Sequence, residues 1–171
     1  DGDDMSEIFV SSAAQLKTAL SVARDGDTIS LKGGAYGDVT ISGVSFASGV
    51  TIASADAGAP ASFHSLNIVG SKGLDFSGVN IDFTPTMTTY AFSPALRINT
   101  SSDISFTGGK IVGGPAINGV SPDAPVGTSD STGNVLGLYT GRGVSIEKSS
   151  DVTIANSDIS ALMKGVVLTE V

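Results

Sequence analysis

The sequence has no cysteine and a single histidine, His64, in 171 residues. Disulfides and thiolate metal sites are therefore excluded, and a zinc site of the usual histidine and cysteine kind is not expected. Charged residues make up only 15% of the chain, and no apolar run approaches the length of a membrane span. Seventeen acidic residues against nine basic ones give a formal net charge of −8, which argues against nucleic acid as a partner.

Glycine is abundant, with 22 residues, and short apolar segments recur at a fixed spacing. Steps of eight and then five residues separate the apolar positions in three repeats: Ile68, Phe76 and Ile81; Ile98, Phe106 and Ile111; Ile146, Ile154 and Ile159. Another apolar residue stands two places before the first and second position of each repeat, as on one side of a β-strand. These residues are Leu66, Leu74, Leu96, Ile104, Val144 and Val152.

A fixed period of this size is typical of a solenoid, in which each repeat packs only on its neighbours. A fourth repeat begins at Val166 and Leu168, and Leu168 follows Ile146 by 22 residues. We therefore predict an all-β chain, a right-handed parallel β-helix with three strands per turn and a basic turn of about 22 residues. We expect it to span residues 27–171 and to be truncated at its C-terminal end, since Val171 interrupts a repeat. The alternative is that the open end stacks on another copy, giving an end-to-end homo-oligomer.

Residues 8–26 predict a strand followed by a short capping α-helix. Ser12 and Gln15 have the spacing of a capping box, and Gly26 is placed to end the helix in a left-handed conformation. The helix would cover the open end of the first turn with the apolar stripe Leu16, Ala19, Leu20 and Ala23. The first turn, with Leu31, Ile41 and Ile52 facing inward, has irregular spacing. We expect residues 1–7 to be a disordered or vector-derived terminus.

The run SSAAQLKTALSVARDGDTISLKGGAYGDVTIS, followed by VTIASADAGAPASFHSLNIVG and LDFSGVNIDF, resembles right-handed β-helix polysaccharide lyases of the chondroitinase B and alginate lyase type. It is also similar to β-helix regions of bacterial secreted proteins with Ca²⁺-binding repeats, some of them alginate epimerases. The resemblance covers Ile8–Phe83 and rests on scaffold motifs, which occur with different activities. It implies that the catalytic lysine and arginine, and the calcium ligands, lie on turns further along. We therefore assign no catalytic residue in this chain, and Ca²⁺ is the one cofactor that stays open.

Two insertions interrupt the repeat. They are Thr84–Ala95 and Gly113–Gly143, and both fall between a third strand and the next first strand. Because the eight-and-five spacing is kept on either side, both insertions should leave the same corner of the solenoid. Repeat proteins collect such insertions on one face, often the binding face. Between the first and second strands, the equivalent residues Ser71, Ser101 and Ser149 are interpreted as structural, since their hydroxyls can bond neighbouring backbone.

The insertions and the strands beside them carry the candidate substrate-binding residues. Tyr90 and Tyr139 could stack on sugar rings, and basic side chains could neutralise the carboxylates of a uronic-acid glycan. The basic candidates are Arg97, Lys110, Arg142, Lys148 and Lys164.

Two further features are weaker candidates for a functional site. His64 is expected to be an exposed turn residue rather than a general base. Asp123, Asp130 and Asn134 offer oxygen ligands for Ca²⁺, but their spacing matches neither an EF-hand nor the nonapeptide Ca²⁺-binding repeat.

The leading hypothesis is the N-terminal β-helix portion of an extracellular polysaccharide-active protein, a uronic-acid glycan lyase or epimerase, with an acidic polysaccharide as partner. On this hypothesis the present chain lacks the catalytic turns and is itself inactive. The alternative is a non-catalytic structural or adhesive β-helix that self-associates through its open end.

Overall fold

The structure is a computed structural model that describes residues 5–86, 89–117, 127–128 and 134–170. Within these ranges the chain is mostly β, with a single helix, α1 (Ala13–Val22). The strands are β1 (Glu7–Val10), β2 (Thr28–Leu31), β3 (Gly34–Ser42), β4 (Ser45–Ser54), β5 (Ala61–Val69), β6 (Lys72–Ser77), β7 (Asn80–Asp82), β8 (Pro94–Asn99), β9 (Ser102–Thr107), β10 (Lys110–Val112), β11 (Arg142–Glu147), β12 (Ser150–Ala155), β13 (Asp158–Ser160) and β14 (Lys164–Thr169). No helix in the described ranges has the length and apolar character needed to cross a membrane.

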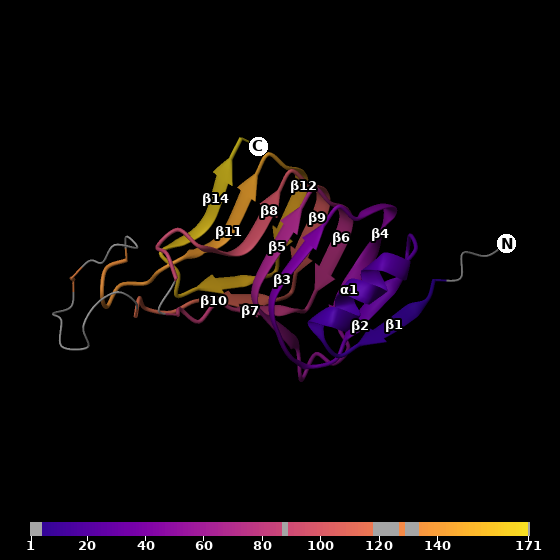
Figure 1. Cartoon of the computed structure of the whole chain (residues 1–171), viewed down its shortest axis with the longest axis horizontal. Coiled ribbons are helices and arrows are strands. Elements are labelled where there is room, and N and C mark those ends of the chain that lie inside the picture. Colours follow the sequence, from indigo (N-terminus) through magenta and orange to yellow (C-terminus); the bar gives the residue numbers. More distant parts are fainter. Residues whose placement is uncertain (1–4, 87–88, 118–126, 129–133, 171) are drawn as a thin grey trace.

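One sheet has six strands in the order β1-β2-β4-β6-β9-β12, and every neighbouring pair is parallel (Figure 1). Its register places apolar side chains in line, because Ile52 pairs with both Ile29 and Phe76, and Phe76 pairs with Phe106. All four of these side chains are buried. A row of large apolar residues therefore runs along the inside of this sheet.

The other sheet bends at β5, whose two halves pair with different strands. Ser62 and Phe63 pair with β7, whereas Leu66–Val69 pair with β8. The first arm continues to β10 and β13, the second continues to β11 and β14, and β3 pairs along β5 on its other side. The strands thus form three parallel columns, and we call one passage of the chain through them a coil. Parallel sheets with one helix are consistent with the predicted parallel β-helix.

We number the three columns by their order along each coil. The first column holds the second halves of β3 and β5, then β8, β11 and β14. The second column is the six-stranded sheet, and the third holds the first halves of β3 and β5, then β7, β10 and β13. The predicted inward residues Leu31, Ile41 and Ile52 are all buried.

Helix α1 begins where the sequence predicts. The Ser12 hydroxyl accepts a hydrogen bond from the Gln15 amide at 3.2 Å, and the buried Leu16, Ala19 and Leu20 pack on the core. The return bond of the predicted capping box differs, because the Gln15 side chain accepts from the Ser11 amide at 2.8 Å and not from Ser12.

The predicted end of the helix is wrong. Ala23 already has an extended backbone, and its N–H donates to the carbonyl of Ala19. Gly26 has a φ of +85° but lies beyond the helix, where its N–H donates to the carbonyl of Gly49 in the next coil. The left-handed residue thus turns the chain into the first coil instead of ending the helix.

A ladder of three serines joins successive coils between the first and second columns. The Ser71 amide donates to the Ser101 hydroxyl at 3.1 Å, and the Ser101 amide donates to the Ser149 hydroxyl at 3.0 Å. Each hydroxyl in turn donates to the carbonyl two residues before it in sequence. All three serines are buried. Their predicted structural role is confirmed, since the hydroxyls satisfy buried backbone amides that the strands do not reach.

Replacing Ser101 with alanine should lower the free energy of unfolding by about 1–3 kcal/mol, because the buried Ser71 amide loses its acceptor. Denaturation by urea measures the change. Ser102→Ala is the matched control, since Ser102 is the next residue, is half-buried and lies outside the ladder. An equal loss in both variants would show that the ladder has no special part in stability.

Candidate functional site

The two insertions leave the same corner, between the third and first columns. Residues 83–93 connect β7 to β8, and residues 113–141 connect β10 to β11. We call the described residues 84–86, 89–93, 113–117 and 134–141, together with residues 161–163 of the last coil, the loop corner. In Figure 1 these segments extend from one end of the molecule, opposite α1.

Hydrogen bonds bind the two insertions to each other. The buried Asn134 amide donates to the Thr89 carbonyl at 2.6 Å, and its side-chain oxygen accepts from the Thr140 hydroxyl. The Gly141 N–H donates to the Ala91 carbonyl at 3.1 Å. Asn134 is only 3% exposed. The two insertions therefore form one unit held by a buried amide, because such a side chain stays inside only when its polar atoms are paired.

Phe83 lies under this unit and fixes the path of the second insertion. A Cβ atom on Gly141 would approach the Phe83 ring to 2.6 Å, and Gly141 has a φ of +82°. Both facts require glycine at this position. The next residue, Arg142, donates its N–H to the Ser93 carbonyl at 2.8 Å. The end of the long insertion thus lies directly against Phe83 and against the end of the short insertion.

Exposed apolar side chains gather at the loop corner. Tyr90 is 61% exposed and Tyr139 is 57% exposed. Four other large apolar side chains of this corner are exposed as well: Phe92, Ile117, Leu138 and Met163. Beside them lies a hollow of about 280 Å³, whose lining includes Leu138, Tyr139, Leu162 and Met163. Several exposed apolar side chains beside a hollow are typical of a binding site.

Arg142 supplies a positive charge at the same place. Its guanidinium carbon lies 5.2 Å from the centre of the Phe92 ring, a distance at which the cation attracts the ring face. Within the described part of the chain it makes no ion pair, and its buried Nε has no hydrogen-bond partner. The guanidinium is therefore held against an aromatic ring without a direct ion pair, although its charge helps to lower the pKa of Glu147.

The other basic candidates do not all share this surface. Arg97 lies on the outer face of the first column, where it pairs with Glu147 at 2.7 Å. The hydrogen bond from Arg97 outweighs the effect of burial and lowers the pKa of Glu147. Lys148 lies at the opposite turn, with a φ of +47°, and its amine is 3.3 Å from the Glu170 carboxylate.

The remaining two lysines are the first residues of their strands. Lys164 begins β14, and its backbone N–H donates to the Gly141 carbonyl at 3.3 Å. Lys110 begins β10, so it lies at the end of that strand away from the insertions. The structure therefore places Tyr90 and Tyr139 on the loop corner and Arg142 and Lys164 at the starts of the strands next to it, whereas Arg97, Lys110 and Lys148 lie elsewhere.

His64 is not the exposed turn residue that we expected. It lies in β5 and is about one third exposed, with its side chain at 31%. Its Nδ1 is 2.6 Å from a carboxylate oxygen of Asp38, and its Nε2 is 2.9 Å from the Thr84 carbonyl oxygen. Its ring stacks on Phe83, with 5.4 Å between centres. The expectation failed because the apolar spacing does not give the register of the irregular first coil. It is this register that brings Asp38 to His64.

Both ring nitrogens of His64 face acceptors, an arrangement that only the doubly protonated ring satisfies fully. Burial lowers the pKa of His64, but the hydrogen bonds to Asp38 and to the Thr84 carbonyl, with the charges of Asp38 and Asp82, raise it above its usual value. The hydrogen bond from Ser65, followed by that from His64, lowers the pKa of Asp38. Because Nε2 donates to a backbone carbonyl, His64 has no free nitrogen to act as a base here.

The predicted calcium ligands are only partly described. Asn134 is a described residue, and its side chain is used in the bonds to Thr89 and Thr140. Asp123 and Asp130 lie outside the described residues. Among those that are described, no group of three acidic, histidine or cysteine side chains could hold a metal ion.

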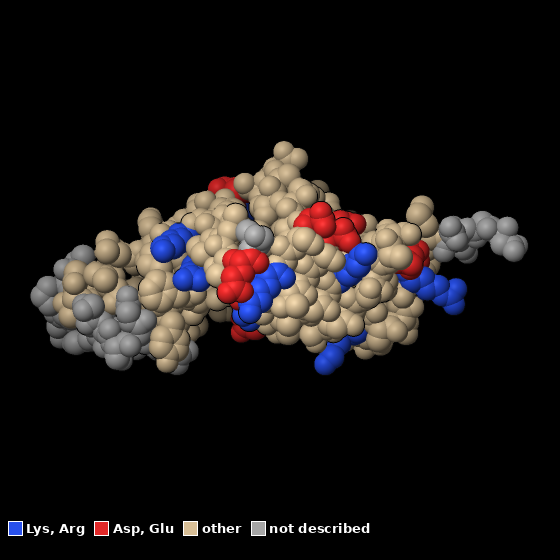
Figure 2. Space-filling view, turned by 90° about the horizontal axis from the view of Figure 1, so that it is seen from above, with Lys and Arg blue, Asp and Glu red and all other residues tan. Residues whose placement is uncertain are grey.

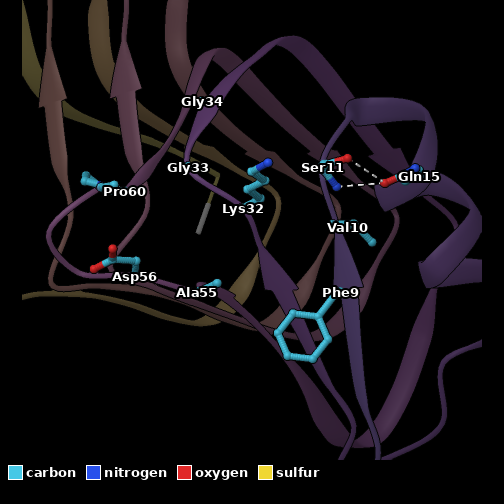
Figure 3. Close-up of a pocket in the computed structure, with 11 residues that line it drawn as sticks. Phe9, Val10, Ser11, Gln15, Lys32, Gly33, Gly34, Ala55, Asp56 and Pro60 are labelled. Atoms are coloured by element: carbon cyan, nitrogen blue, oxygen red, sulfur yellow. Dashed lines mark hydrogen bonds between the residues drawn. The ribbon is translucent and has the colours of Figure 1, made fainter.

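A second hollow, of about 560 Å³, lies at the other end of the molecule beside β1 and the start of α1 (Figure 3). Phe9, Lys32, Asp56 and Pro60 contribute to its lining. The Ser11 side chain and amide, seen at one side of it, are both bonded to Gln15. This hollow is mostly apolar and open, and the repeat spacing gave no sign of it.

Comparisons with known proteins give little beyond this geometry. No family model matches the chain, and no curated protein matches it significantly. Among solved structures, an alginate lyase from Paenibacillus sp. strain FPU-7 is similar at 16% identity and a TM-score of 0.42. The alignment covers 95% of this chain and 74% of that enzyme. A likeness this distant establishes neither a family nor an activity.

Replacing Asn134 with alanine should loosen the contact between the two insertions, because the Thr89 carbonyl and the Thr140 hydroxyl lose their common partner. We expect a loss of about 1–3 kcal/mol in unfolding free energy. Cleavage by chymotrypsin at Tyr90 and Tyr139 should become faster. Asn99→Ala is the control, since Asn99 bonds only its exposed neighbour Thr100 through the side chain. Unchanged proteolysis in Asn134→Ala would contradict the role given to this amide.

Proposed function

We propose that the chain is a right-handed parallel β-helix of an extracellular polysaccharide-active protein, of the uronic-acid lyase or epimerase type. In this proposal the loop corner binds an acidic glycan. The right hand follows from the general rule for crossovers between parallel strands. The observation that carries the binding proposal is Arg142 over the Phe92 ring, with the exposed Tyr90 and Tyr139 on insertions that leave the same corner of a regular scaffold.

The chemistry of the cluster suits a sugar chain. Tyr90 and Tyr139 offer flat apolar faces with a hydroxyl at the rim, which is the combination that covers the apolar face of a sugar ring. Arg142 can bind a carboxylate through two parallel N–H groups. Its contact with Phe92 fixes the guanidinium before a ligand arrives, so less conformational entropy is lost on binding.

The charge distribution limits how such a ligand would bind. The chain carries a net charge of −8. On the face seen in Figure 2, acidic and basic side chains are interspersed and no large basic surface gathers the lysines and arginines. An acidic glycan would therefore be held by local contacts at the corner, with little long-range attraction. We expect its affinity to depend mainly on Arg142 and the aromatic rings.

The proposal assigns binding, and not catalysis, to the described residues. An enzyme that removes a proton next to a uronate needs a free base beside a group that neutralises the carboxylate. His64 donates both of its N–H groups, and Arg97 is paired with Glu147. In this arrangement His64 offers no nitrogen to a ligand, and the Arg97 guanidinium is already paired.

A second candidate function is self-association through the last coil. The side chains of Val166 and Leu168 in β14 are exposed, at 50% and 58%. Among the strands of the described ranges, β14 pairs only with β11, so its other edge has no strand beside it there. Such an edge can bind a further strand. This function would make the protein a structural or adhesive element.

Replacing Arg142 with alanine should weaken the binding of an alginate oligosaccharide by about tenfold, because a charged hydrogen bond to the ligand carboxylate is lost. Isothermal titration calorimetry measures the affinity, with a neutral oligosaccharide of the same length as the ligand control. Lys148→Ala is the matched protein control, since it removes one positive charge from the opposite turn.

Equal weakening by both substitutions would mean that net charge, and not the loop corner, determines binding. If no acidic oligosaccharide binds, and the solution mass of the protein rises with concentration, self-association is the better account.

A further inference from the structure

His64 connects the scaffold to the loop corner. On one side it contacts Asp38 of β3, and on the other it contacts the Thr84 carbonyl, the first residue of the first insertion. Its ring lies against Phe83, and Phe83 lies against Gly141 at the end of the second insertion. A continuous series of contacts thus runs from the His64 ring through Phe83 to the backbone next to Arg142.

The contacts of His64 depend on its having two N–H groups. A neutral imidazole has one N–H and one lone pair. After loss of a proton, the N–H is best kept on Nδ1, where the acceptor is the charged carboxylate of Asp38. Nε2 would then present a lone pair to the Thr84 carbonyl oxygen at 2.9 Å, and that contact would become repulsive.

The groups around His64 favour the charged ring. Asp38 faces it from β3 and Asp82 from the end of β7, and Ser65 donates to Asp38 at 2.5 Å. Asp82 also accepts a hydrogen bond from the Thr84 hydroxyl at 2.8 Å. The Thr84 side chain therefore stays attached when the ring is neutral, and only its carbonyl is released. We expect a small movement of the start of the insertion, and not local unfolding.

We propose that His64 is a pH-dependent positioning residue for the loop corner: the doubly protonated ring holds the first insertion in place, and the neutral ring releases it. That this changes glycan affinity rests on the binding function proposed above. Below the usual histidine pKa of 6.5 the contact contributes its full stabilisation. As the pH rises through the raised pKa of His64 in the folded protein, this stabilisation is lost.

The single histidine makes the test direct, because one imidazole spin system reports its protonation by NMR between pH 5 and pH 9. In the same spectra the backbone amide of Gly141 should shift with the same midpoint as the imidazole, while the amide of Ser101 at the opposite turn should not. In Asp38→Asn both midpoints should fall together by about one pH unit, because a neighbouring negative charge is removed. In His64→Gln the Gly141 amide should show no transition in this range.

Alginate oligosaccharide affinity, measured on the same proteins, should fall about fivefold above the midpoint in the wild type and remain constant in His64→Gln. A Gly141 shift that persists in His64→Gln, or that is absent from the wild type, would overturn the proposal. If the amides follow His64 but no acidic oligosaccharide binds at any pH, the positioning role stands and the glycan function fails. If the glycan binds and neither the amides nor the affinity follow His64, the positioning role fails.

Discussion

The structure depends on the register between parallel strands of successive coils. Each backbone ladder fixes its neighbours, and the rows of inward isoleucine, leucine and phenylalanine side chains match only in one register. A shift by one residue would turn a strand's apolar side chains outward. Extra chain can therefore be added only where the ladders are interrupted, at a corner. Ser71 and Ser101 are 30 residues apart and Ser101 and Ser149 are 48 residues apart. This constraint explains why the strands before and after each insertion nevertheless keep the same register.

The loop corner follows from that constraint. Chain that leaves the ladders loses its backbone partners and must satisfy them in another way. Here Asn134 supplies the Thr89 carbonyl with a donor, and Gly141 and Arg142 donate to Ala91 and Ser93. The Tyr90 and Tyr139 side chains of the insertions lie outside the core cluster and remain exposed. The rigid scaffold thus holds in a defined place the kind of surface that binds ligands.

Features that repeat could be predicted from the sequence, and side-chain pairs between outward residues of different coils could not. The spacing identified the inward rows, the serine turns and the corner of the insertions, because each depends on local periodicity. The pairs Asp38–His64 and Arg97–Glu147 are 26 and 50 residues apart. Predicting these pairs requires the register of the outward residues. In the first coil this register shifts at Gly37, which pairs with Phe63, so the repeat spacing does not give it. The end of α1 was also missed, because Ala23 leaves the helix before Gly26.

The central claim is that register brings the two insertions together over Phe83. The most direct measurement is the set of nuclear Overhauser effects from the Phe83 ring protons. The structure predicts strong cross-peaks to the Gly141 Hα protons on one side and to the His64 ring on the other. Cross-peaks from Phe83 to neither residue would mean that the insertions leave the solenoid at separate places, and the loop corner as described would not exist.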